Sequence, residues 1–157
     1  TGELIAGLVG AAVTRAFLVG GAVWLAMALW PGVHVPFRHV GAALWFGLMG
    51  ALMLSFLGLL TSIWAEKFDH AAAVTNFVVA PLSLLSGTFY AVDALAPLWR
   101  GISHANPFFY VISGFRYGFL ERADSPVLLG AALLAAINLI LLAACFLLLR
   151  SGWKIKN

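Results

Sequence analysis

The chain has 157 residues, of which 63% are hydrophobic and only 10% are charged, a balance that excludes an ordinary water-soluble domain. Its formal net charge of +3 comes from nine basic and six acidic residues, which are spread thinly between apolar runs. Because nucleic-acid binding needs clustered basic side chains, the composition predicts an integral membrane protein with no nucleic-acid partner.

Four apolar segments are long enough to cross a bilayer, since each exceeds the roughly 20 residues that a hydrocarbon core of about 30 Å requires. They are residues 4–30, 40–65, 71–92 and 126–149. Two pairs in these segments, Gly7 with Ala11 and Gly47 with Ala51, have the four-residue step that lets helices pack closely. The sequence therefore predicts an all-α membrane protein in which residues 1–157 form part of one transmembrane domain.

Arg15 is the one charge inside these four segments, about 11 residues or about 17 Å into the first. That depth exceeds what snorkelling comfortably covers, so two interpretations stay open. The guanidinium faces a polar pathway or a partner elsewhere in the protein, or the helix starts at the interface and keeps Arg15 near the headgroups.

Charge gathers most densely in the turn between the second and third segments, AEKFDH, with Glu66, Lys67 and Asp69. The C-terminal tail RSGWKIKN carries three basic residues and no acid, which favours a cytoplasmic C-terminus. With four spans, the N-terminus of the chain and the charged turn are then cytoplasmic as well.

The stretch PFFYVISGFRYGFL, residues 107–120, is apolar but too short to span. As a helix it rises about 21 Å, against a hydrocarbon core of about 30 Å. Asn106-Pro107 breaks the chain before it, because proline disfavours helix in the preceding residue and suits the first turn of the next helix. We therefore predict a re-entrant helical hairpin over about 95–120, between the third and fourth spans, turning at Asn106.

A set of residues between 80 and 120 forms a recognisable pattern: a proline within the third span, a Gly-Thr-Phe-Tyr exit, an Asn-Pro turn and an Arg-Tyr-Gly near the end. They are Pro81, Gly87, Phe89, Tyr90, Pro97, Asn106, Pro107, Tyr110, Arg116, Tyr117 and Gly118. The pattern resembles the membrane-spanning permease subunit of type-2 ABC exporters. Members of that family have six spans, and this chain is similar to the last four, so we expect it to be the C-terminal portion of such a domain.

The resemblance implies export of a drug, lipid-linked or polysaccharide-like substrate across the bacterial inner (cytoplasmic) membrane. It implies that Glu66, Lys67 and Asp69 contact an ABC ATPase subunit, that a second permease copy completes a homodimer, and that the patterned residues form a re-entrant gate. The chain itself would be no enzyme and hold no cofactor or metal, because ATP and Mg²⁺ would be bound by the ATPase, and the sequence contains no GxxxxGK[ST] phosphate loop.

Other interpretations remain open. Arg116 either gates the exit or simply braces its helix by pairing with Glu121 or Asp124, while Tyr110 turns its ring to lipid. A membrane-embedded lipid-modifying enzyme would need acid, base or metal groups converging at one depth, and the four histidines fall on three separate loops without metal-ligand spacing. A passive channel or scaffold is the third alternative.

Overall fold

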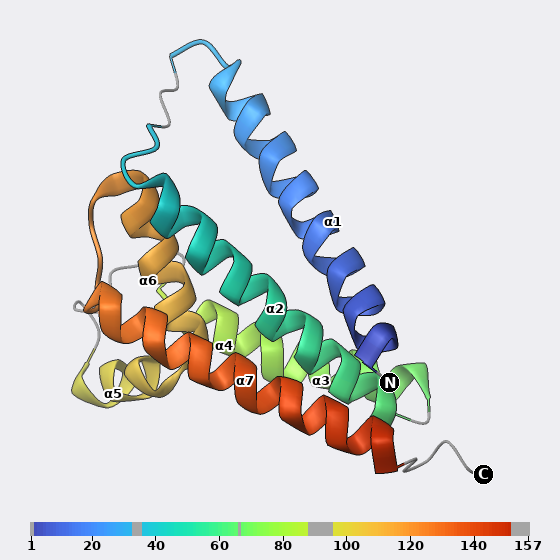
Figure 1. Cartoon of the computed structure of the whole chain (residues 1–157). Coiled ribbons are helices and arrows are strands. Elements are labelled where there is room, and N and C mark those ends of the chain that lie inside the picture. Colours follow the sequence, from blue (N-terminus) through green and yellow to red (C-terminus); the bar gives the residue numbers. More distant parts are fainter. Residues whose placement is uncertain (1, 33–35, 66, 88–95, 152–157) are drawn as a thin grey trace.

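A computed structural model describes residues 2–32, 36–65, 67–87 and 96–151, and within these ranges the chain is helical with turns and no strand (Figure 1). The all-α class predicted from the sequence is confirmed for the described residues. Three helices are long and apolar enough to cross a membrane: α1 (Gly2–Ala28), α2 (Val40–Trp64) and α7 (Val127–Ser151). Their ends lie within two residues of the ranges predicted for the first, second and fourth spans.

The third predicted span corresponds to α3 (Phe68–Val74), η1 (Thr75–Val79) and α4 (Ala80–Leu84), which follow one another without a break. Together they rise about 25 Å, slightly less than a hydrocarbon core. The predicted continuation to residue 92 includes Phe89 and Tyr90, which lie outside the described residues. The count of four spans therefore stays a prediction.

One π-helical turn, η1, interrupts this helix immediately before Pro81. In it the Ala80 N–H donates to the Thr75 carbonyl, five residues back instead of four. Pro81 has no N–H for the Phe77 carbonyl, and its ring crowds that carbonyl. The wider turn gives the proline room, so the helix passes Pro81 and ends only at Leu84.

The hairpin consists of α5 (Pro97–Ala105) and α6 (Pro107–Leu120), separated by Asn106. Asn106 caps α6, because its Oδ1 accepts from the Phe108 N–H at 3.0 Å, and Pro107 occupies the first turn. At the other end Glu121 adopts a left-handed conformation (φ 56°) and stops α6. The break at Asn106-Pro107 and the extent of α6 are as the sequence predicts.

Helix α6 lies antiparallel against the Val40 half of α2. Val111 packs on Gly50, Gly114 on Phe46, and Gly118 on Ala43. A Cβ added to Gly118 would lie 2.7 Å from the backbone N and Cβ of Ala43, so only glycine allows this approach. At its start α6 joins the core through Phe108, which clusters with Phe46, Met49, Met53 and Leu134.

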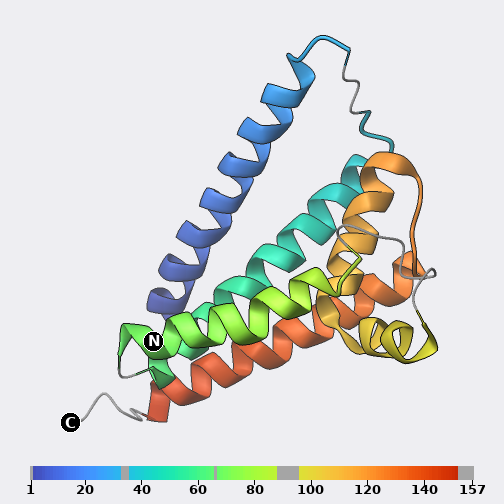
Figure 2. The ribbon, with the colours of Figure 1, turned by 180° about the vertical axis from the view of Figure 1, so that it is seen from behind.

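Helix α1 is attached differently. Near its start Ile5 and Val9 pack on Phe56 and Cys145, and further along the helix diverges from α2, as Figures 1 and 2 both show. The predicted close-packing pair Gly7 and Ala11 is exposed, and a Cβ on Gly7 would meet nothing within 4 Å. That pair therefore packs on no other described helix.

Candidate functional site

The C-terminal end of α4 is capped by side chains from the hairpin. A helix end leaves its last carbonyls without intrahelical partners, and within a membrane these need other donors. The donors come from three positions: Asn106 Nδ2 to Leu82 O (2.6 Å), Ser103 Oγ to Leu85 O (2.9 Å) and Arg116 Nη2 to Gly87 O (2.6 Å). We call these three bonds the capping contacts. They fasten the broken third helix to both arms of the hairpin.

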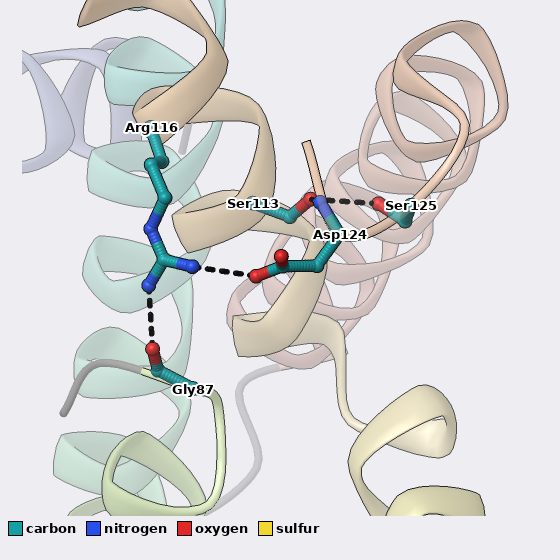
Figure 3. A network of polar contacts seen from close by, with 5 residues as sticks. All are labelled: Gly87, Ser113, Arg116, Asp124 and Ser125. Carbon is teal, nitrogen blue, oxygen red and sulfur yellow. Dashed lines mark hydrogen bonds and ion pairs between the residues drawn. The ribbon is translucent and has the colours of Figure 1, made fainter. Parts of the chain in front are cut away.

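Arg116 also joins the hairpin to the approach to α7 (Figure 3). Its Nη1 lies 2.6 Å from Asp124 Oδ2, with about a quarter of each side chain exposed. The Asp124 N–H donates to Ser113 Oγ at 2.9 Å, and Ser113 and Ser125 share a hydroxyl hydrogen bond of 3.0 Å. Of the two acids that the sequence offers Arg116, the structure selects Asp124. One guanidinium thus connects the turn after α4, helix α6 and the segment before α7.

The second predicted acid, Glu121, belongs to a separate group at the start of α2. Its carboxylate lies 3.5 Å from His39 Nε2, and the His39 ring stacks on Tyr117 at 4.7 Å. The Gly118 carbonyl accepts from the N–H groups of Arg38 (3.0 Å) and His39 (2.9 Å). The Arg-Tyr-Gly triplet is therefore divided, with Arg116 facing α4 and α7 while Tyr117 and Gly118 face α2.

Tyr110 takes no part in the Arg116 network. It packs beside Gly130 of α7, and its ring meets Phe109 edge-on at 5.2 Å between centroids. The side chain is half-buried against the core, so its ring is held by protein instead of lying wholly in lipid. Tyr110 and Arg116 are thus placed independently by the structure.

The charged turn lies at the Trp64 end of α2, opposite the end that meets α6. Lys67 is the exposed residue that precedes α3, and Asp69 is exposed in its first turn, where a carboxylate complements the helix dipole. Glu66 lies outside the described residues. The two described charges are available to a partner but form no site by themselves.

Arg15 lies within α1 (Gly2–Ala28). Its side chain is exposed and forms no ion pair with a described residue. Both interpretations of Arg15 stay open: a guanidinium that faces a polar pathway or a partner elsewhere in the protein, and a helix start at the interface that keeps Arg15 near the headgroups.

Three groups of contacts could not be predicted from the sequence. Ser103 and Ser113 carry no sequence signal, because isolated serines are common in membrane helices. Gly118 belongs to the predicted pattern, but neither its packing on Ala43 nor that of Gly114 on Phe46 is predicted, although the two glycines have the four-residue step that lets helices pack closely. Asn138, a lone amide in an apolar run, is buried and donates to the Met49 carbonyl at 3.0 Å, which joins α7 to α2. Among the described residues no group of His, Cys, Asp or Glu could hold a metal.

Comparison with known proteins agrees with the resemblance seen in the sequence. The family described as "ABC-2 type transporter" matches residues 1–120. The chain is 39% identical over 160 residues to the inner membrane transport permease YadH of Escherichia coli strain K12, an alignment that covers 100% of this chain and 60% of YadH. YadH of Shigella flexneri matches equally.

A more distant relative is nodulation protein J of Neorhizobium galegae, 24% identical over 124 residues that cover 76% of this chain and 45% of that protein. The chain thus spans less than two thirds of the length of each of these relatives. No solved structure matches it.

Proposed function

Because the chain belongs to the ABC-2 type transporter family, we propose that it is the C-terminal part of an exporter permease that moves a drug, lipid-linked or polysaccharide-like substrate out of the cytoplasm. ATP would be hydrolysed by a separate ABC ATPase subunit holding ATP and Mg²⁺, and a second permease copy would complete the pathway. The name of the E. coli relative supports transport as the activity and the inner membrane as the place.

One observation carries the proposal: α6, the second arm of the hairpin, lies beside only the first half of α2. Its inner end, at Phe108, packs on Met49 and Met53 near the middle of α2, and its outer end, at Gly118, meets Arg38 and His39 before α2 begins. A helix covering half of a neighbouring span fits a re-entrant segment, provided that its backbone groups are satisfied by protein. At the hairpin turn the Phe108 N–H donates to Asn106 Oδ1, the Phe109 N–H to the Asn106 carbonyl and the Asn106 N–H to the Ser103 carbonyl, which supports that condition.

In this proposal four spans surround the hairpin, and both ends of the chain and the charged turn face the cytoplasm. The helix from Phe68 to Leu84 then connects the turn that meets the ATPase with the hairpin that closes the outer exit. Lys67 and Asp69 suit docking to a charged surface, and Glu66 would join them. The π turn before Pro81 offers a bend, so that movement at the turn reaches the hairpin through the capping contacts.

Arg15 remains a candidate for the pathway or for a buried contact elsewhere in the full protein. Replacing it with leucine removes the charge of α1 at this position. Loss of export with normal assembly would favour the pathway, whereas loss of assembly would favour a structural contact.

The full-length permease, co-expressed with its ATPase and reconstituted together with it, tests the function. We expect the two to co-purify, ATP turnover to require both, and inside-out vesicles to accumulate substrate only with ATP. Lysine at both Glu66 and Asp69 should lower permease-stimulated ATP turnover several-fold, while Arg122→Gln, on an exposed loop at the other end, should not. The proposal would be contradicted if the permease did not change the rate of ATP turnover, or if substrate accumulated in the vesicles without ATP.

A further inference from the structure

A cavity of about 360 Å³ lies between α1, α2 and α6, apart from the capping contacts. Its lining residues are hydrophobic or glycine; they include Phe17, Gly21, Trp24, Phe37, Gly47 and Phe119. Its volume is in the range of ligand pockets, roughly 300–1,000 Å³, yet the one polar side-chain group among the lining residues is the indole N–H of Trp24, which is buried without a hydrogen-bond partner. Water is a poor occupant too, since it needs two or more polar partners.

The cavity opens between α1 and α2, which are each apolar and long enough to span. Its α1 wall comes from the C-terminal half, Ala16 to Trp24, the part that diverges from α2 in Figures 1 and 2. In a membrane this opening meets hydrocarbon. The occupant most directly available to such a cavity is an acyl chain.

The end of the cavity near the start of α2 is closed by a row of rings. Trp24 meets Phe37 at 5.2 Å between centroids, and Phe37 meets Phe119 at 4.5 Å. The next residue, Arg38, is exposed, and its backbone N–H is fixed on the Gly118 carbonyl. The Arg38 guanidinium forms no ion pair with a described residue, whereas the neighbouring His39 side chain lies beside the Glu121 carboxylate.

Arg38 thus stands where α2 would reach the headgroup layer, beside an aromatic wall and an apolar cavity. Guanidinium binds phosphate through two parallel hydrogen bonds, and arginines near span ends commonly lie at headgroup level. An apolar cavity with a cation next to its aromatic end is complementary to a phospholipid, which has an apolar chain and an anionic head.

We propose that the cavity binds one acyl chain of a bilayer phospholipid, with the phosphate at Arg38. This goes beyond the transport function and does not depend on it. Because Phe115 and Phe119 of α6 form part of the wall, the bound lipid contacts the hairpin directly. The lipid around the protein would therefore influence how the hairpin packs.

The test uses the full-length permease alone, without an ATPase, in nanodiscs of phosphatidylglycerol and phosphatidylcholine, with retained lipid counted by native mass spectrometry. The filling variant is Gly21→Leu, because a Cβ there meets nothing within 4 Å and the side chain can enter the cavity. The matched control is Gly10→Leu, on the same helix, equally unobstructed and outside the cavity. We expect Gly21→Leu to lose one retained phospholipid per chain and Gly10→Leu to keep it.

A second arm addresses the headgroup. Arg38→Gln should lower the preference for phosphatidylglycerol over phosphatidylcholine several-fold, while Arg122→Gln, an exposed cation elsewhere, should leave it unchanged. Equal retention in Gly21→Leu and wild type would overturn the proposal. A second pair of results would also overturn it: wild type retains no lipid, and the Gly21→Leu variant fails to assemble. Another span or a second copy of the permease would then fill the cavity.

Displacement of the lipid by transported compounds would assign the cavity to the transport pathway and would also overturn the proposal. None of these outcomes depends on ATP, so they leave the exporter function to its own experiment.

Discussion

Helices α6 and α1 both pack against α2, but by opposite means. Helix α6 approaches through Gly114 and Gly118, and the capping contacts hold the hairpin to α4. Helix α1 touches its neighbours mainly near its start, and only 11% of its most apolar window is buried, against 33% for α2. The contrast separates a fixed hairpin from a helix with most of its surface free for lipid or further protein.

The difference between the two helices follows from the lipid bilayer in which they pack. Lipid tails are as apolar as leucine, so apolar helices gain nothing from hydrophobicity alone when they associate in a bilayer. Association needs small residues that permit close packing, or hydrogen bonds across helices. Helix α6 has both, whereas Gly10, Gly20 and Gly21 of α1 face open space.

The largest expected effect comes from the glycine contact of α6. Gly118→Leu drives a side chain into the backbone of Ala43, and overpacking of this kind costs about 3 kcal/mol or more. Gly10→Leu on α1 should change stability by less than about 0.5 kcal/mol. Thermal unfolding of the two full-length variants in the same detergent measures both. Similar stability in the two would remove the distinction between fixed and free helices.

The next effect comes from Arg116. Arg116→Met leaves the Asp124 carboxylate and the Gly87 carbonyl without their donor, and we expect a loss of about 2 kcal/mol, below the value for a fully buried pair because the groups are partly exposed. Adding Asp124→Leu should recover part of the loss, since the unpaired charge disappears. A double-mutant cycle checks this, and strictly additive losses would show that the pair does not interact.

Substitutions at Asn106 distinguish the stability that comes from the cap of α6 from the stability that comes from the bond to α4. Asn106→Ala removes both the cap of α6 and the bond to Leu82, at a cost of about 2 kcal/mol, whereas Asn106→Ser keeps a capping oxygen and should cost about 1 kcal/mol. Urea or thermal unfolding of the two variants gives the difference. Identical losses would mean that the contact with α4 adds nothing to the cap.

The smallest effect is expected at Ser103, whose hydroxyl donates one bond to the Leu85 carbonyl. Ser103→Ala should cost about 1 kcal/mol, measured in the same unfolding assay. Ser62→Ala on α2 is the matched control, because that hydroxyl bonds only within its own helix. A loss no greater than in the control would show that this capping contact is dispensable.

Local chemistry explains what the sequence predicts well. The Asn-Pro pair specifies both the cap and the first turn of α6, and α6 has the extent predicted for residues 107–120. Three of the four predicted spans have helices of the expected extent. The third is harder to judge from sequence, because Pro81 is accommodated by a π turn and the end of the predicted span lies outside the described residues.

Some of the contacts that the sequence does not predict are made where the chain reverses direction after α6. Glu121 is nearer to Arg116 in sequence than Asp124 is, yet the ion pair forms with Asp124, because the chain turns at the left-handed Glu121 and returns to Ser113 with Asp124. The aromatic cavity likewise depends on how far α1 diverges from α2. No periodicity in either helix encodes that divergence.

Sidedness tests the re-entrant hairpin most directly. Cysteines placed singly at exposed Arg100 in α5, Arg122 after α6 and Lys67 in the charged turn of the full-length protein can be treated with a membrane-impermeant thiol reagent in intact cells. The hairpin predicts labelling at Arg100 and Arg122 from the periplasmic side and at Lys67 only after the membrane is opened. Arg100 and Arg122 labelled from opposite sides would mean that α6 crosses the bilayer, and would contradict the account.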